Sequence, residues 1–156
     1  MKIGVLSDTH GLKSIAEKAL DNMGDIDILL HAGDLVADAR HFENKGYKVY
    51  FVAGNCDGHI FEPTEKILEI QGKKIFLTHG HAYRVQYGYD KLFNRAKEIS
   101  ADIVVFGHTH VPENTYIDNI LFFNPGSIVL PRGGGPGTYG ILEIIDGQIN
   151  ARLNTI

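Results

Sequence analysis

The chain has a single cysteine, Cys56, among its 156 residues. One cysteine cannot form a disulfide within the chain, which excludes the disulfide-stapled class of small secreted domains and fits a reducing compartment. No stretch of ~18 apolar residues is present, so no membrane-spanning helix is expected. The opening stretch, MKIGVLSDTHG, turns polar too early for a secretory signal peptide. We therefore expect a cytoplasmic protein without a membrane partner.

Clusters of Lys and Arg are also missing. The chain carries 15 Lys and Arg against 19 Asp and Glu, which gives a formal net charge of −4. A nucleic-acid groove needs positive charge concentrated on one face, so nucleic acid is not an expected partner. A weakly acidic protein can still act on phosphate esters if bound metal ions supply the positive charge.

Length and composition are those of an ordinary globular protein. The chain is 44% hydrophobic and 22% charged, and its length suits one domain, which we expect to span residues 1–156. No internal repeat is present. The one compositionally biased stretch, PRGGGPGTYG at 131–140, is typical of a surface loop between two strands.

The first third of the chain has the pattern of a parallel sheet. Short apolar runs rich in Val, Ile and Leu predict buried strands at residues 3–6, 26–30 and 49–52. Helical spacing of apolar residues predicts a helix over 12–23 that stops at Gly24, and another over 35–45 that stops at Gly46. This βαβαβ order is typical of α/β proteins.

The rest of the chain predicts a second sheet. The pattern indicates a hairpin of 65–70 and 74–78 joined by 71–73, a helix over 88–99, a strand at 103–106, and later antiparallel strands at 113–118, 119–124, 139–145 and 147–153. We expect an α/β fold with four layers, α/β/β/α, in which two mixed sheets are flanked by helices. Exposed strands late in the chain would make a homo-oligomer plausible.

Polar residues that can bind metals stand at the ends of five of the apolar runs: Asp8, His10, Asp34, Asn55, His79, His108 and His110. Successive run ends are 21 to 29 residues apart, about one strand plus a segment that returns to the same edge of a sheet. In open α/β sheets, sites form outside the carboxyl ends of the strands. In extended backbone, residues i and i+2 point to the same side, so each D-x-H or H-x-H pair can aim two side chains at one place.

The donor set suggests the kind of metal. Two Asp, one Asn and four His offer oxygen and imidazole ligands without a thiolate, which suits Mn²⁺, Fe, Zn²⁺, Ni²⁺ or Co²⁺. Seven ligands are too many for one tetrahedral ion but suit two ions that share a carboxylate. We therefore expect two divalent transition-metal ions, with manganese foremost, in the arrangement that serves displacement at phosphorus.

The segments DTH, GD, GN, THG and GHTH, in this order, resemble the calcineurin-like metallophosphoesterase superfamily. Its pattern is D-x-H, G-D, G-N-H-[D/E], H and G-H-x-H. The resemblance runs from residue 3 to about residue 127, and the GNCD variant is similar to the small bacterial and archaeal phosphodiesterases. It implies the metallo-dependent phosphatase fold and hydrolysis of small phosphodiesters in preference to monoesters.

Carried over by position, the resemblance also implies a ligand for each metal. Asp8, His10 and His110 would hold one ion, and Asn55, His79 and His108 the other. Asp34 would bridge both ions together with a hydroxide that acts as the nucleophile.

The same resemblance implies which residues act on the substrate. Asp34, Asn55 and His108 would be the catalytic residues. Asn55 would also reach the substrate phosphate, with Cys56 and His81 as further substrate contacts.

One position departs from the family pattern. Cys56 stands where the family has the histidine proposed to protonate the leaving group, and the following acidic residue, here Asp57, would orient that histidine. A thiol is a poor general acid. Three readings stay open: substrates with good leaving groups need no acid, His81 or His59 replaces it, or turnover is low and binding is the real task. Cys56 could also be a small buried residue behind Asn55.

Two other assignments remain alternatives at this point. The chain could be a catalytically weak or inactive scaffold that keeps the fold for protein interaction, as a retromer subunit of this fold does; the complete set of metal positions favours an enzyme. Outside the ligand set, Asp38 is expected to cap a helix or face solvent. Arg84 and Arg132 are the nearest cations for a substrate tail, and Tyr83, Tyr87 and Tyr89 either rim a pocket or pack in the core.

Overall fold

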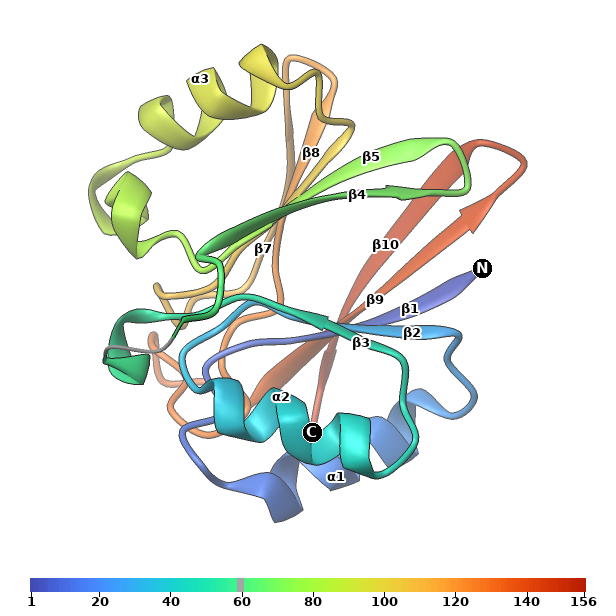
Figure 1. Ribbon diagram of the computed structural model, residues 1–156, viewed down its shortest axis with the longest axis vertical. Helices are drawn as coiled ribbons and strands as arrows, with labels where there is room; N and C mark the ends of the chain where they lie inside the picture. The colour runs from blue at the N-terminus through green and yellow to red at the C-terminus, as the bar shows by residue number, and fades with distance from the viewer. Residues whose placement is uncertain (59–60) are drawn as a thin grey trace.

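The computed structural model describes residues 1–58 and 61–156. Its strands form two five-stranded sheets that pack face to face (Figure 1). The first sheet contains β1 (Lys2–Leu6), β2 (Ile28–His31), β3 (Val49–Phe51), β9 (Thr138–Ile145) and β10 (Gln148–Thr155). The second sheet contains β4 (Glu65–Ile70), β5 (Lys73–Thr78), β6 (Ile103–Val105), β7 (Glu113–Ile117) and β8 (Ile120–Asn124).

Helices cover the outer face of each sheet (Figure 1). The first sheet is covered by α1 (Lys13–Met23) and α2 (Val36–Asn44), and the second by α3 (Asp90–Glu98). Short 3-10 turns follow two of the strands: η1 (Asn55–Asp57) follows β3, and η2 (His81–Tyr83) and η3 (Val85–Tyr87) follow β5. The expected α/β/β/α layering is confirmed. No helix in the described residues has the length and apolar character needed to cross a bilayer.

Alternation along each central strand explains the layers. In β1, Val5 belongs to the core between the two sheets, whereas the next residue, Leu6, belongs to the core beneath α1 and α2. In the second sheet, Val105 faces the inter-sheet core and Val104 faces the core beneath α3. Successive side chains of a strand point to opposite faces, so both faces must be apolar, and the strands read as continuous apolar runs.

Strand direction places the site. In the first sheet, which has the order β10-β9-β1-β2-β3, strands β1, β2 and β3 are parallel, so their carboxyl ends lie at one edge. In the second, ordered β4-β5-β6-β8-β7, strands β5, β6 and β8 are parallel. The loops that follow β1, β2, β3, β5 and β6 therefore meet at the left-hand side of the molecule in Figure 1.

Two details differ from the sequence prediction. Strand β2 begins at Ile28 rather than residue 26, because Asp27 instead bonds to Lys2 through both its backbone and its carboxylate. The late strands are not all antiparallel to their neighbours: β8 is parallel to β6, and the β9–β10 hairpin returns to the first sheet beside β1. Both corrections involve partners that are distant in sequence.

Candidate metal centre

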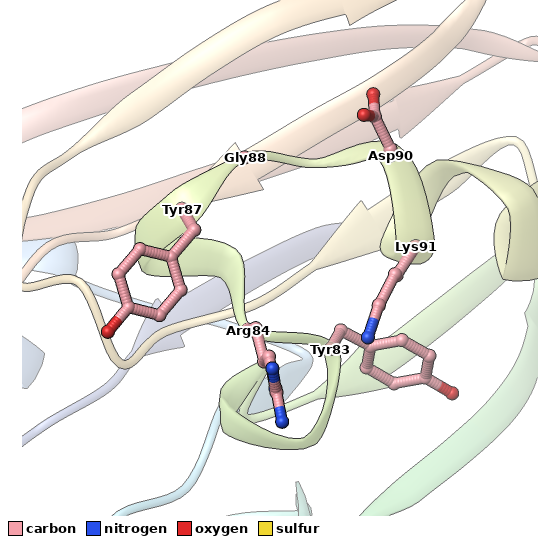
Figure 2. Close-up of a pocket in the computed structure, with 6 residues that line it drawn as sticks. All are labelled: Tyr83, Arg84, Tyr87, Gly88, Asp90 and Lys91. Atoms are coloured by element: carbon pink, nitrogen blue, oxygen red, sulfur yellow. The ribbon is translucent and has the colours of Figure 1, made fainter.

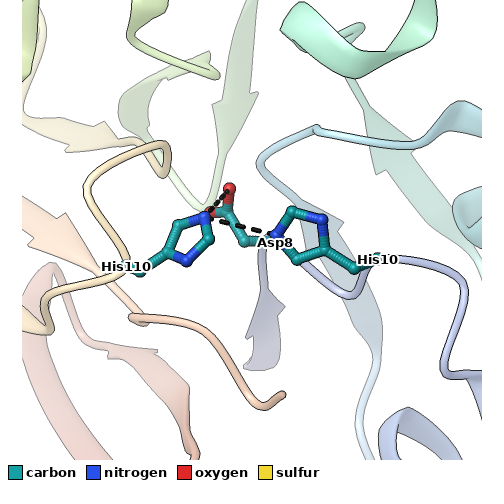
Figure 3. A group of neighbouring side chains, drawn as sticks. All are labelled: Asp8, His10 and His110. Carbon is teal, nitrogen blue, oxygen red and sulfur yellow. Dashed lines mark hydrogen bonds and ion pairs between the residues drawn. The ribbon is translucent and has the colours of Figure 1, made fainter. Parts of the chain in front are cut away.

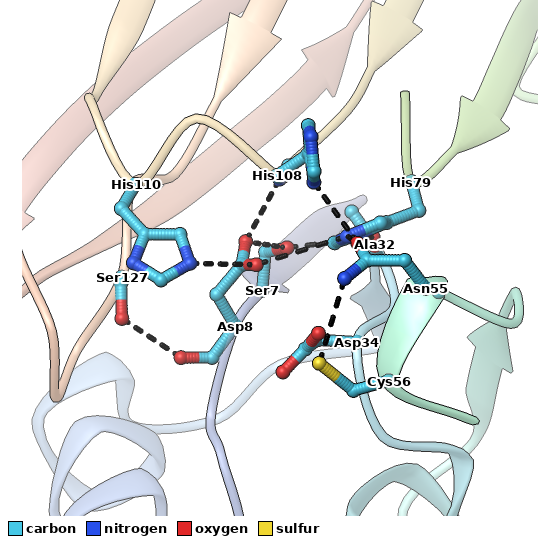
Figure 4. Close-up of polar contacts among 12 residues, drawn as sticks. Ser7, Asp8, Ala32, Asp34, Asn55, Cys56, His79, His108, His110 and Ser127 are labelled. Carbon is cyan, nitrogen blue, oxygen red and sulfur yellow. Dashed lines mark hydrogen bonds and ion pairs between the residues drawn. The ribbon is translucent and has the colours of Figure 1, made fainter. Parts of the chain in front are cut away.

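All seven residues predicted at the strand ends lie together at the edge where the two sheets meet (Figures 3 and 4). Three of them, Asp8, His10 and His110, place their ligand atoms within 4.8 Å of one another; we call them the Asp8 trio. The Nε2 atoms of His10 and His110 are 3.3 Å apart, and His110 Nε2 is 3.2 Å from Asp8 Oδ1. Three donors thus surround one point (Figure 3).

A second group, the Asn55 trio, consists of Asn55, His79 and His108. Asn55 Oδ1 lies 2.9 Å from His79 Nε2 and 3.0 Å from His108 Nδ1. These residues follow β3, β5 and β6, so this trio joins the two sheets (Figure 4). An amide oxygen and two imidazole nitrogens again converge on one place.

Asp34 follows β2 and lies between the trios. One of its carboxylate oxygens groups with Asp8 and His79 within 4.8 Å, and the same limit holds for Asp34 with His10 and Cys56. Its Oδ2 atom is 2.8 Å from His10 Nδ1. Asp34 belongs to neither trio, but its carboxylate lies within this distance of ligand atoms from both.

Two buried carboxylate oxygens test whether metal ions fit this site. Asp8 is 1% exposed and Asp34 is 2% exposed, and Asp8 Oδ1 and Asp34 Oδ2 have no hydrogen-bond partner in the described residues. Histidine nitrogens lie near both oxygens, but not in hydrogen-bond alignment. Burying an unpaired anionic oxygen is costly unless a cation compensates it, so the residues fit bound cations.

The tautomers of two histidines also indicate a metal site. The Nδ1–H groups of His79 and His110 donate to the backbone carbonyls of Ala32 and Leu130, each at 2.8 Å. Each Nε2 atom is then left with a lone pair directed at the centre. An imidazole whose outer N–H is held by a carbonyl is the usual arrangement of a metal-binding histidine.

Asp8 is fixed by its neighbours. Its Oδ2 atom accepts hydrogen bonds from Ser7 Oγ at 2.6 Å and from the His108 backbone N–H at 3.0 Å, while Ser127 Oγ donates to its backbone carbonyl at 2.8 Å. Burial raises the pKa of Asp8, but the contacts with His110 and His79 outweigh it and hold that pKa below its usual value. The same contact with Asp8 raises the pKa of His110.

The backbone at the site corrects the geometric argument made from sequence. Five of the seven residues have left-handed backbone, namely Asp8 (φ 53°), His10 (45°), Asp34 (96°), His108 (69°) and His110 (58°). The D-x-H and H-x-H pairs are therefore not extended. Asp8 and His10 do share a trio, whereas His108 and His110 belong to different trios. Such conformations of non-glycine residues cost about 1–3 kcal/mol each and persist where surrounding contacts enforce them.

Glycines beside the site allow close approach of the backbone. A Cβ atom on Gly107 would lie 1.9 Å from Ser7 Oγ, and one on Gly54 would lie 2.4 Å from the backbone nitrogen of Asp34. Neither glycine has a positive φ, so space rather than conformational freedom requires them. A larger residue at either position would force the loop carrying His108 or Asn55 away from the loops that follow β1 and β2.

Asp57, the acidic residue of the GNCD segment, holds the backbone. Its two carboxylate oxygens accept hydrogen bonds from the backbone N–H groups of Gly54 at 2.8 Å and Val36 at 2.7 Å. Val36 is the first residue of α2, so Asp57 joins the turn that carries Asn55 to the helix that follows Asp34. Sequence reasoning gave Asp57 only the orientation of a histidine that this chain lacks.

Cys56 is exposed, so the expectation that it is buried behind Asn55 is wrong. Its sulfur lies 3.5 Å from Asn55 Nδ2 (Figure 4). The neighbouring Asp34 carboxylate, followed by burial, raises the pKa of the Cys56 thiol to about 11. The thiol therefore stays protonated at neutral pH in the metal-free protein.

Of the two substitutes considered for the missing acid, only His81 can be placed. Its ring centre lies 5.4 Å from that of His79 and 6.2 Å from that of His108, so His81 lies beside the Asn55 trio. Burial lowers its pKa below the ordinary histidine value. His59 lies outside the described residues.

Two cavities lie on the segment that follows His81. One of about 370 Å³ is lined by Tyr83, Arg84, Tyr87, Gly88, Asp90 and Lys91 (Figure 2). The other, of about 310 Å³, is lined by Val85, Gln86, Tyr89, Thr109, Val111 and Arg132. Thr109 stands between the two ligands of the GHTH segment, so the second cavity lies next to the centre. Arg84 and Arg132 thus each line a cavity, and the tyrosines are divided between them.

The two-sheet fold and the cluster of potential metal ligands are those expected of a metallophosphoesterase domain. Residues 1–147 match the family model of the calcineurin-like phosphoesterase superfamily domain. The chain belongs to this superfamily, as the motif order in its sequence indicated.

Individual relatives agree with this assignment. The probable metallophosphoesterase YsnB of Bacillus subtilis is 34% identical, with 98% of this chain and 90% of YsnB covered. The phosphodiesterase MJ0936 of Methanocaldococcus jannaschii is 32% identical, with 92% of this chain and 93% of that protein covered. A crystal structure of a predicted phosphoesterase from Streptococcus pneumoniae superposes with a TM-score of 0.85 at 35% identity, covering 99% of this chain and 88% of that one.

Proposed function

We propose that this protein is a phosphodiesterase that uses two divalent metal ions to hydrolyse small phosphodiesters. The observation that carries this proposal is the pair of donor trios joined by Asp34, in which two buried carboxylate oxygens have no hydrogen-bond partner among residues 1–58 and 61–156. The similarity to proteins named as phosphodiesterases supports the choice of substrate class.

In this proposal the Asp8 trio would hold one ion, the Asn55 trio would hold the other, and Asp34 would be shared by both. When bound, the ions would neutralise charge on the phosphoryl oxygens and lower the pKa of a bound water molecule. Manganese is the first candidate, with Ni²⁺, Fe, Zn²⁺ and Co²⁺ as alternatives that the donor set also suits.

The protein side chains then bind and orient the phosphate. The oxygen of the Asn55 amide faces His79 and His108, and its Nδ2 group contacts Cys56 Sγ at 3.5 Å, which leaves a second Nδ2 hydrogen to donate to a phosphoryl oxygen. The backbone N–H of His108 holds Asp8, while the His108 ring would bind the ion beside Asn55. Cys56 lies beside the Asn55 amide and His81 lies beside His79 and His108, and in this proposal both would contact the substrate.

The site offers only weak proton donors for the leaving group, which favours diesters whose leaving group needs no protonation. In the metal-free protein the pKa of the Cys56 thiol is raised to about 11, mainly by Asp34, which makes the thiol a weak acid. His81, whose pKa is lowered by burial, is mostly unprotonated there. We therefore propose substrates whose leaving group departs as a stable anion, such as aryl or acidic alcohol esters.

The test is a metal-dependent assay with matched substrates. Protein stripped with EDTA should not hydrolyse bis(p-nitrophenyl) phosphate, and Mn²⁺ or Ni²⁺ should restore turnover. The monoester p-nitrophenyl phosphate should be hydrolysed more slowly. Tight metal binding without turnover of any ester would contradict the enzyme and favour the scaffold alternative. Turnover that persists in EDTA would contradict the role of the metals.

A further inference from the structure

A buried polar network outside the seven ligands lies behind the Asp8 trio. It consists of Thr9, His31 and Asp38, which are 0%, 0% and 1% exposed. The expectation that Asp38 caps a helix or faces solvent is therefore wrong. These residues come from the loop after β1, the end of β2 and the helix α2, so the network ties three elements together.

The direction of each hydrogen bond follows from the donors available. The Thr9 hydroxyl donates to Asp38 Oδ2 at 2.6 Å, and the Gly11 backbone N–H donates to the same oxygen at 2.8 Å. The single Thr9 hydrogen is then used, so His31 Nε2, 3.1 Å away, must carry a hydrogen and donate to Thr9 Oγ1. One oxygen of the Asp38 carboxylate thus binds the loop after β1 at two residues, Thr9 and Gly11.

His10 lies between Thr9 and Gly11 in the chain. Its backbone is left-handed with φ 45°, and its neighbour Gly11 has φ 78°. A left-handed non-glycine residue must be held by its surroundings. Asp8, at the start of the loop, has separate contacts with Ser7, His108 and Ser127, whereas Thr9 and Gly11 are both bound to Asp38.

We propose that Asp38 is a positioning residue for His10: it fixes the Thr9–Gly11 backbone so that the imidazole faces Asp8 and His110. The proposal rests on the proposed function, because it assumes that His10 binds a metal ion. It assigns to Asp38 a role that a helix cap or a simple core contact would not have.

The test measures metal binding rather than activity. Metal-free protein is titrated with Mn²⁺, and the free ion is followed by electron paramagnetic resonance. Asp38→Ala should weaken one of the two ions about 10–100-fold, the usual effect of losing a group that orients a ligand, and leave the other within about threefold. Asp38→Asn should bind both ions nearly normally, because its amide oxygen can accept both hydrogen bonds. Equal weakening of both ions by Asp38→Ala, or no weakening, would overturn the proposal.

Two controls separate positioning from general destabilisation. Asp102→Ala removes a similar carboxylate-to-backbone bond, with the Lys74 N–H at 2.8 Å, at the opposite end of the strands. It should leave both Mn²⁺ affinities unchanged. If Asp38→Ala does not fold, Thr9→Val removes the Thr9–Asp38 bond with a side chain of similar shape but keeps the Gly11–Asp38 bond, so a smaller loss at the same ion is expected.

A double-mutant cycle tests whether Asp38 acts through His10. In a His10→Ala background, Asp38→Ala should cause no further loss of Mn²⁺ affinity, whereas in a His79→Ala background it should cause the full loss. Additive losses in the His10→Ala background would contradict the inference and leave the metal centre intact. A wild-type protein that binds no Mn²⁺ would instead contradict the proposed function, and this inference with it.

Discussion

The two sheets contribute different chemistry to the same centre. Loops after the first sheet provide both carboxylates and the amide, Asp8, Asp34 and Asn55, together with His10; loops after the second sheet provide only histidines. The carboxylates are almost fully buried, whereas His108 and His110 are partly exposed. The difference indicates that the first sheet supplies fixed negative charge, and the second supplies neutral ligands that complete each trio.

The largest effect is expected where the first sheet serves both trios. Asp34→Asn keeps the shape of the side chain but removes the shared charge, so the affinity for both ions should fall. Activity toward bis(p-nitrophenyl) phosphate should drop on the order of 10³-fold, which corresponds to several kcal/mol of transition-state stabilisation.

The matched variant comes from the second sheet. His110→Ala removes a neutral ligand of the Asp8 trio alone and should weaken one ion while the other still binds. Steady-state kinetics and Mn²⁺ titration of both variants check the contrast. An Asp34→Asn protein with normal turnover would contradict the shared role.

The next effect concerns His31, a histidine of the first sheet that faces away from the centre. Burial lowers its pKa to about 4 from 6.5. The unfolded chain therefore takes up a proton near pH 6.5 while the folded protein does not, and stability falls as the pH drops from 6.5 toward 4. The loss should reach about 3 kcal/mol at pH 4.

Urea unfolding of the metal-free protein across this pH range measures the effect. His31→Gln cannot take up a proton, so the difference between the wild type and this variant isolates the contribution of His31. Parallel stability curves for the two proteins would show that His31 titrates normally in the folded state.

A smaller effect tests how closely the two sheets approach. Gly107→Ala would place a Cβ atom 1.9 Å from Ser7 Oγ, which joins the second sheet to the first. Overpacking of this kind should cost about 1–3 kcal/mol of unfolding free energy. Gly135→Ala is the control, since nothing lies within 4 Å of its added Cβ, and its change should stay within about 0.5 kcal/mol. Equal thermal stability of both variants would show that the loops adjust freely.

The last effect concerns the reactivity of Cys56 and leaves the stability of the fold unchanged. With its pKa raised from 9.0 to about 11 by Asp34, this exposed thiol should react with iodoacetamide roughly 100-fold more slowly at pH 7.5 than an ordinary cysteine. Asp34→Asn should speed the reaction, because it removes the carboxylate that contributes most to the raised pKa. Mass spectrometry of metal-free protein over time provides the rates. Rapid labelling of the wild type would place the sulfur away from Asp34.

Much of the fold could be predicted because the central strands are covered on both faces. Runs such as 3–6 and 103–106 can only be buried, and the helix over 12–23 has one apolar face followed by Gly24. The membership of β9 and β10 in the first sheet could not be predicted, since it depends on pairing with β1 across most of the chain. Local pattern carries no information on such distant partners.

The site, like the fold, could be predicted from sequence only where local pattern determines it. The seven strand-end residues could be found because their types and order match a donor set at one edge of a sheet. Their left-handed backbone could not, because side chains with a Cβ rarely adopt it and only tertiary contacts enforce it. Asp38 and Asp57 were misassigned because their partners are groups that the fold brings to them from other loops.

The most direct test of the whole account is a crystal structure of the protein soaked in Mn²⁺, with anomalous diffraction used to locate the ions. Two anomalous peaks are expected, one among Asp8, His10 and His110 and one among Asn55, His79 and His108, with the Asp34 carboxylate contacting both. Crystals that show no peak at these positions, or a single peak that Asp34 does not touch, would contradict the shared two-metal centre.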